Sequence, residues 1–152
     1  MVAVFSGGDG WALLREGRAR EAQAAFGGAA ARQPRDGGVK AGFAIAAAAS
    51  GELEMAAWSM RRALKVDAKA LAHLPVDESL SRTLLTLIDE FAISEGGRVE
   101  MRDAAFMRAA LHYLLGEPGA ARRALALAVE MGEDNPGADA LQRLIAETSS
   151  VG

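Results

Sequence analysis

The chain has 152 residues, 51% of them hydrophobic and 24% charged, with a formal net charge of −3 and no cysteine. This apolar content excludes a disordered chain, and the length suits one domain. Without cysteine there is no disulfide, thiolate nucleophile or cysteine-ligated zinc, and the mildly acidic balance argues against nucleic acid as a partner. Alanine is the most abundant residue and aromatic residues are few, which predicts an all-α fold.

Glycines, prolines and acidic capping residues divide the chain into short helical blocks. The predicted helices span residues 9–16, 19–32, 38–50, 52–66, 77–94, 99–115, 117–131 and 136–147. Gly17, Gly51 and Gly116 separate helices that such short links make antiparallel. Asp77 and Asn135 are predicted N-caps, the second followed by a proline at the first helical position.

The first eight residues are predicted to be a flexible N-terminus. Their apolar start is too short for a signal peptide or a membrane span, so we expect a soluble chain without membrane insertion. The compartment is not encoded. The cytoplasm is expected, or the periplasm if the chain was cut from a longer exported protein.

An internal repeat has an offset of 34 residues. Each copy carries a glycine, a small residue, a bulky residue and a second small residue, at the same spacing. The first copy has Gly17, Ala22, Phe26 and Ala29; the second has Gly51, Ala56, Met60 and Ala63; the third has Gly116, Ala121, Leu125 and Ala128. The small residues allow close approach of helices, and we expect the bulky ones to plug the gap between them.

This pattern resembles the tetratricopeptide repeat (TPR), and the stretch GRAREAQAAFGGAAARQP carries it most fully. The resemblance implies antiparallel helix pairs stacked as a short right-handed superhelix. A single domain would hold the first two repeats (9–68), a linker with an inserted helix (69–98), a third repeat (99–132), and a capping helix with a tail (133–152). We expect Leu141, Leu144 and Ile145 to face inward on the capping helix.

Three departures mark the repeats as degenerate. Ser6 and the glycines after it truncate the first helix, and Arg108 stands where the third copy should be apolar. The spacing between the second and third copies grows from 34 to 65 residues, and the 77–94 helix found there is either an insertion or a strongly degenerated repeat.

The resemblance also implies a concave groove, lined by the first helix of each repeat, that binds an apolar peptide or a partner helix. The expected groove residues are Trp11, Leu14, Arg15, Ala41, Ile45, Ala48, Phe106, Ala110 and Tyr113. An alternative stays open, because a surface this apolar is rarely bare. The inserted helix, with its apolar stripe of Leu80, Leu84, Ile88 and Phe91, or a second copy of the chain, would then fill the groove.

No catalytic constellation is present in the sequence, and we expect no enzymatic activity, cofactor or metal. His73 and His112 are isolated from any nucleophile or metal motif. The arginine pairs at 61–62 and 122–123 are interpreted as solvated faces beside acidic residues, with an anion-binding patch as the alternative. Trp58 is either covered by a helix or an anchor for a partner, and packing is favoured.

These features predict a non-enzymatic scaffold that binds a protein or peptide. Two alternatives are a self-assembly module that forms homo-oligomers, and a regulatory or anchoring segment of a larger protein.

Overall fold

The computed structural model describes residues 8–93 and 97–151, and these residues are all-helical. The eight helices are α1 Gly8–Arg15, α2 Ala19–Arg32, α3 Gly37–Ala49, α4 Leu53–Val66, α5 Glu78–Ala92, α6 Arg98–Leu114, α7 Pro118–Glu130 and α8 Pro136–Val151. The predicted all-α class is therefore confirmed, and most predicted boundaries agree within one or two residues. Two differences concern ends: α8 extends further than predicted, and the predicted end of α5 at Ser94 lies outside the described residues.

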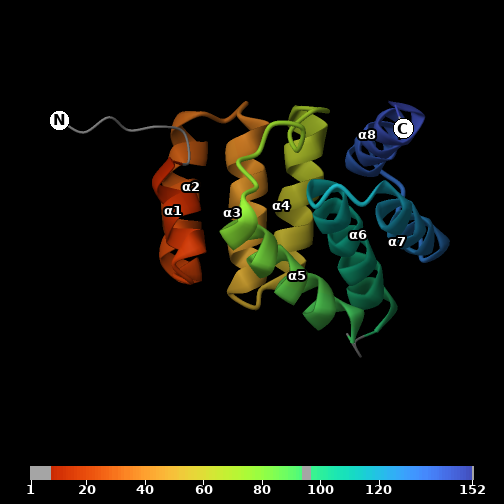
Figure 1. Ribbon diagram of the computed structural model, residues 1–152, viewed down its shortest axis with the longest axis horizontal. Helices are drawn as coiled ribbons and strands as arrows, with labels where there is room; N and C mark the ends of the chain where they lie inside the picture. The colour runs from red at the N-terminus through yellow and green to blue at the C-terminus, as the bar shows by residue number, and fades with distance from the viewer. Residues whose placement is uncertain (1–7, 94–96, 152) are drawn as a thin grey trace.

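Three helix pairs, α1–α2, α3–α4 and α6–α7, follow one another along the molecule (Figure 1). The turn inside each pair has the same backbone geometry, with a positive φ of 78° at Gly17, 85° at Gly51 and 74° at Gly116. In each turn the amide of the residue after the glycine donates a hydrogen bond to the carbonyl oxygen five residues before it, over distances of 2.9, 2.9 and 3.0 Å. Glycine adopts this left-handed conformation without steric cost, which explains why it recurs at these positions.

The small, bulky and small positions of the repeat are buried in all three pairs. Phe26 shows how tight the packing is. A Cβ atom added at Gly10 would lie 2.7 Å from its ring, and one added at Gly42 would lie 2.4 Å away. The Phe26 ring also meets Trp11 edge-on, with the ring centroids 4.9 Å apart. Because Gly10 and Gly42 have no side chains, α1 and α3 can pack closely on the Phe26 ring.

Helix α3 is the centre of the first half of the molecule. It packs against α2 and α4 and also contacts α1 and α5. Asp36 caps it by accepting a hydrogen bond of 3.0 Å from the Val39 amide.

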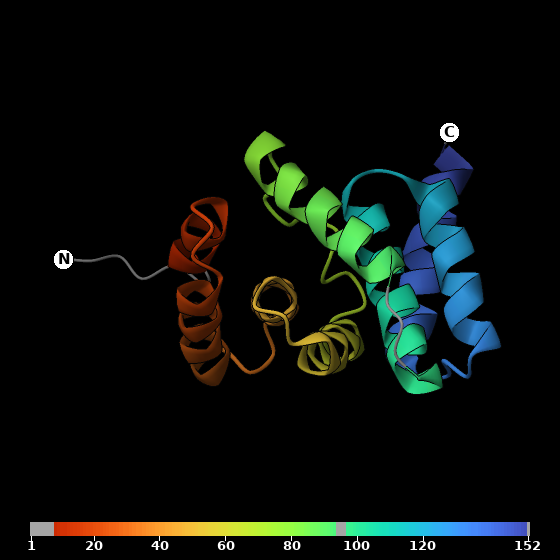
Figure 2. The same ribbon diagram turned by 90° about the horizontal axis from the view of Figure 1, so that it is seen from below.

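Helix α5 lies across one side of the molecule, against α1, α3 and α6 (Figure 2). The predicted cap is confirmed, because the Asp77 carboxylate accepts a hydrogen bond of 2.9 Å from the Leu80 amide. Arg15 of α1 also holds this end, 2.7 Å from Asp77 and 2.7 Å from the Pro75 carbonyl oxygen. The side chains that α5 buries are Leu80, Leu84, Leu87 and Ile88.

Helix α8 packs against both α4 and α7. Its predicted cap is confirmed, with Asn135 accepting a hydrogen bond of 2.9 Å from the Ala138 amide. Leu141, Leu144 and Ile145 are buried, as predicted. Gly137 lies so close to α4 that an added Cβ would be 2.6 Å from the Arg61 carbonyl oxygen.

A buried ion cluster joins α4, α6 and the α7–α8 turn. The guanidinium of Arg61 donates to both Glu133 oxygens, at 2.7 and 2.8 Å, and to Asp103 at 2.6 Å. Burial works against the charged form of Arg61, but these hydrogen bonds outweigh it and raise the pKa of the guanidinium. The solvated face expected at position 61 is therefore wrong, since both of its carboxylate partners are buried.

None of the helices in residues 8–93 and 97–151 combines the length and the apolar character needed to cross a membrane.

Candidate functional site

The nine residues predicted to line a concave groove are mostly buried. All of them come from α1, α3 and α6, the helices that α5 contacts. Arg15 and Tyr113 are half-buried. The buried ones are Trp11, Leu14, Ala41, Ile45, Ala48, Phe106 and Ala110. Helix α5 packs on α1, α3 and α6, as the alternative with an inserted helix expects, but Trp11 packs on Phe26 of α2 and the Phe106 ring lies under Arg61 of α4. Whether the nine residues bind a partner stays a prediction.

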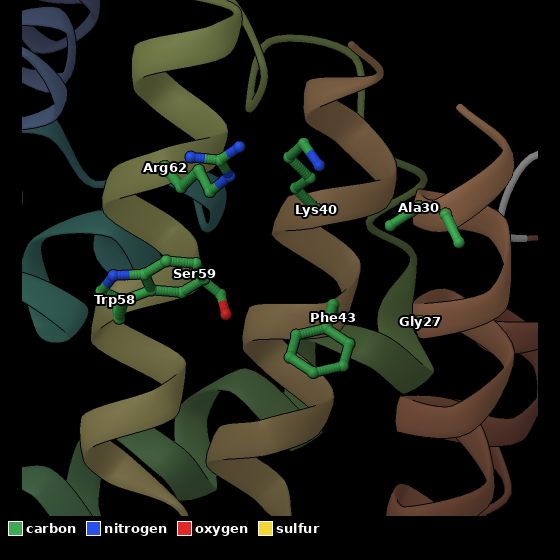
Figure 3. Close-up of a pocket in the computed structure, with 8 residues that line it drawn as sticks. Gly27, Ala30, Lys40, Phe43, Trp58, Ser59 and Arg62 are labelled. Atoms are coloured by element: carbon green, nitrogen blue, oxygen red, sulfur yellow. The ribbon is translucent and has the colours of Figure 1, made fainter. Parts of the chain in front are cut away.

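An open groove exists on another side of the molecule, between α2 and α4. Both helices pack against α3, but within the described residues they do not pack against each other. A hollow of about 350 Å³ remains between them, which we call the α2–α4 groove (Figure 3). Its lining residues are Gly27, Ala30, Ala31, Lys40, Phe43, Trp58, Ser59 and Arg62.

The groove is open because its α2 wall has almost no side-chain bulk. Three lining residues of α2 are glycine or alanine, and a Cβ added at Gly27 would be 3.5 Å from the Phe43 ring. One repeat length further along the sequence, the corresponding positions of α4 carry long side chains. These are Arg61, Leu64 and Lys65. Residues of that size on α2 would project into the space between the helices.

One end of the groove is aromatic. Phe43 on the floor and Trp58 on the α4 wall lie at one level (Figure 3). Trp58 is 58% exposed, so the favoured interpretation of this residue as covered by a helix is wrong. Large exposed aromatic side chains beside an apolar hollow are typical of protein-binding surfaces.

The other end of the groove is cationic. Lys40, N-terminal to Phe43 on α3, and Arg62, C-terminal to Trp58 on α4, lie at the next level beyond the two rings (Figure 3). The Arg62 guanidinium carbon is 5.7 Å from the Trp58 ring centroid. A second hollow of about 270 Å³ shares Trp58 and Arg62 with the groove and adds Lys65 from α4. No aspartate or glutamate is among the described residues that line either hollow.

The aromatic end is bounded by a side-chain hydrogen bond between α2 and α4. The Gln23 amide donates to the Glu52 carboxylate over 2.8 Å, near the N-terminal ends of these helices. A ligand longer than the hollow would therefore extend toward the cationic end.

The residues lining the groove include no histidine or carboxylate that could act as a general base. His112 lies elsewhere, with Nδ1 2.7 Å from the Glu117 carboxylate, and His73 is exposed. No cluster of histidine and acidic side chains suited to a metal ion occurs in residues 8–93 and 97–151.

Sequence reasoning missed this site, although a signal was present. When the first two repeats are aligned, small residues of α2 correspond to long residues of α4. This difference indicates that the α2 side chains leave space open beside the helix. Trp58 and Arg62 are also one helical turn apart on an outward face.

No family model, curated protein or solved structure matches the chain.

Proposed function

We propose that the chain is a non-enzymatic interaction module built from TPR-like helix pairs, and that it binds a protein segment in the α2–α4 groove. The pairs would form a short right-handed superhelix of about three repeats. Three equivalent glycine turns and three equivalent sets of buried small and bulky residues support the repeat.

The observation that carries the binding proposal is the pairing of an exposed Trp58 with an apolar hollow beside it. A tryptophan that is 58% exposed leaves a large apolar area in water, and burying it against a partner is favourable. Phe43 provides a second aromatic surface, and the wall of glycine and alanine lets a partner's backbone approach closely. A hollow of about 350 Å³ is large enough to hold a few side chains of a peptide.

The face under α5 is the weaker candidate for a partner. To bind there, a helix would have to replace the four large side chains that α5 buries. Each such side chain contributes about 1.5–3 kcal/mol, so roughly 6–12 kcal/mol of burial would have to be regained. The α2–α4 groove requires no such displacement.

A random peptide library displayed on phage, selected against the full chain, tests the proposal. We expect enriched peptides that bind Trp58→Ser at least about ten-fold more weakly, because the tryptophan is the central anchor. Leu85→Ser is the matched control, since Leu85 is also a large exposed residue, 47% exposed, but belongs to α5. Absence of any enriched peptide, or equal binding to Trp58→Ser, would contradict the proposal.

A further inference from the structure

We infer that the occupant of the α2–α4 groove is an acidic protein segment with an apolar anchor residue, an inference that rests on the proposed function. The anchor would contact Phe43 and Trp58, and carboxylates next to it would contact Lys40 and Arg62.

Lys40, Arg62 and Lys65 are the cations available to a ligand in the groove and in the second hollow. Arg61 is not available, because Asp103 and Glu133 already neutralise it. Lys40 and Lys65 have no carboxylate within ion-pairing distance in the described part of the chain, and Arg62 is stacked on Trp58. A carboxylate partner would therefore find three cationic groups along this path without displacing an internal ion pair.

The aromatic and cationic groups follow one another along the groove. Aromatic rings lie at one level of the groove and cations at the next (Figure 3). The second hollow continues with Lys65. Trp58 and Arg62 belong to both hollows and form the ridge between them. A segment that runs from the aromatic end across this ridge would place its apolar residue against the rings and its acidic residues against the cations.

The local positive charge of the groove favours acidic segments over basic ones. The chain as a whole has a net charge of −3, so it does not attract acidic partners over long distances. The attraction arises only where these cations gather, with no acidic residue among the described lining positions. Like-charged basic segments would be repelled there, which provides discrimination as well as attraction. Because the site is partly exposed, affinity should fall as the salt concentration rises.

Charge reversal tests this chemistry. The Lys40→Glu/Arg62→Glu chain is selected against the same displayed library as the unmodified chain. The control is Lys69→Glu/Arg82→Glu, which makes the same change of net charge at two exposed positions outside the groove. Both replaced groove residues are partly or fully exposed, so we expect the helical circular dichroism to be retained.

We expect the unmodified chain and the control to enrich peptides that carry Glu or Asp beside Phe, Leu or Trp. The groove variant should bind these peptides at least about ten-fold more weakly and should enrich peptides with Lys or Arg instead.

Other outcomes separate the two proposals. Enriched peptides that need Trp58 but lack an acidic excess, or that the charge-reversed chain still binds, would overturn the inference and leave the proposed function standing. No enrichment at all would overturn both. Vesicles of phosphatidylserine are the remaining probe. If the chain binds these vesicles through Lys40 and Arg62 but does not bind acidic peptides, the inference is overturned in favour of a membrane surface.

Discussion

The buried cluster around Arg61 predicts a large effect of a single substitution on stability. Arg61→Met removes the cation that two buried carboxylates share, Glu133 at 2.7 Å and Asp103 at 2.6 Å. The side chains of these two residues are only 1% and 5% exposed, so water cannot replace the lost partner. Arg102, the next cation, is 3.9 Å from Glu133, too far for a hydrogen bond.

Breaking a buried ion pair by removing one partner costs about 3–5 kcal/mol, because the other charge stays buried without compensation. We therefore expect Arg61→Met to lower the free energy of unfolding by about 3–5 kcal/mol. For a chain of this length, that loss corresponds to a fall in the midpoint of thermal unfolding of roughly 10 °C.

Urea and thermal unfolding followed by circular dichroism would measure both quantities. Arg82→Met is the control, because its pair with Glu78 is long, at 3.8 Å, and exposed, and such pairs contribute little. Neutralising the carboxylates together with the arginine, in Arg61→Met/Asp103→Asn/Glu133→Gln, should recover much of the loss. If Arg61→Met unfolds at the same midpoint as the Arg82→Met control, the cluster does not hold α4, α6 and the α7–α8 turn together.

Two further predictions concern the packing of α3 and the cap of α5. Gly42→Ala should destabilise the chain by about 1–3 kcal/mol, because the added Cβ would lie 2.4 Å from the Phe26 ring. Gly28→Ala is the control and should not destabilise the chain, because it adds a methyl group near a flexible arginine only. Equal unfolding midpoints for the two variants would refute this. The pKa of Asp77 is lowered, first by the hydrogen bond from the Leu80 amide and then by Arg15. Its contribution to stability is therefore complete above the unfolded-state pKa near 3.8 and is lost as the pH falls through the lower folded-state value. Asp77→Asn should be less stable at neutral pH and should approach the unmodified chain in strong acid, as pH-dependent urea unfolding would show; a constant difference would contradict the assignment.

The helices and their ends are largely predictable from the sequence because the signals there are local. Glycine at positions 17, 51 and 116 is required by backbone conformation, and Asp77 and Asn135 hydrogen-bond to amides three residues away. Interactions of this kind need no knowledge of the rest of the fold.

The candidate site is less predictable because it depends on distant contacts. Trp58 lies on an amphipathic helix, and only the packing of α2 and α8 decides whether another helix covers it. The same reason applies to Arg61, whose partners at positions 103 and 133 are far away in the sequence. The sequence predicts an apolar face on α1, α3 and α6, but whether α5 covers it depends on the path of the chain.

The two tryptophans of the chain report on the two candidate faces separately. Trp11 lies on α1, is 7% exposed and packs edge-on against Phe26, whereas Trp58 lies in the α2–α4 groove and is 58% exposed. Fluorine NMR of the full chain labelled with 5-fluorotryptophan, titrated with an enriched acidic peptide, therefore shows which face the peptide occupies. We expect the Trp58 signal to shift with saturation while the Trp11 signal stays in place. A shift of Trp11 with an unchanged Trp58 would contradict binding in the α2–α4 groove, because the peptide would then bind beside α1.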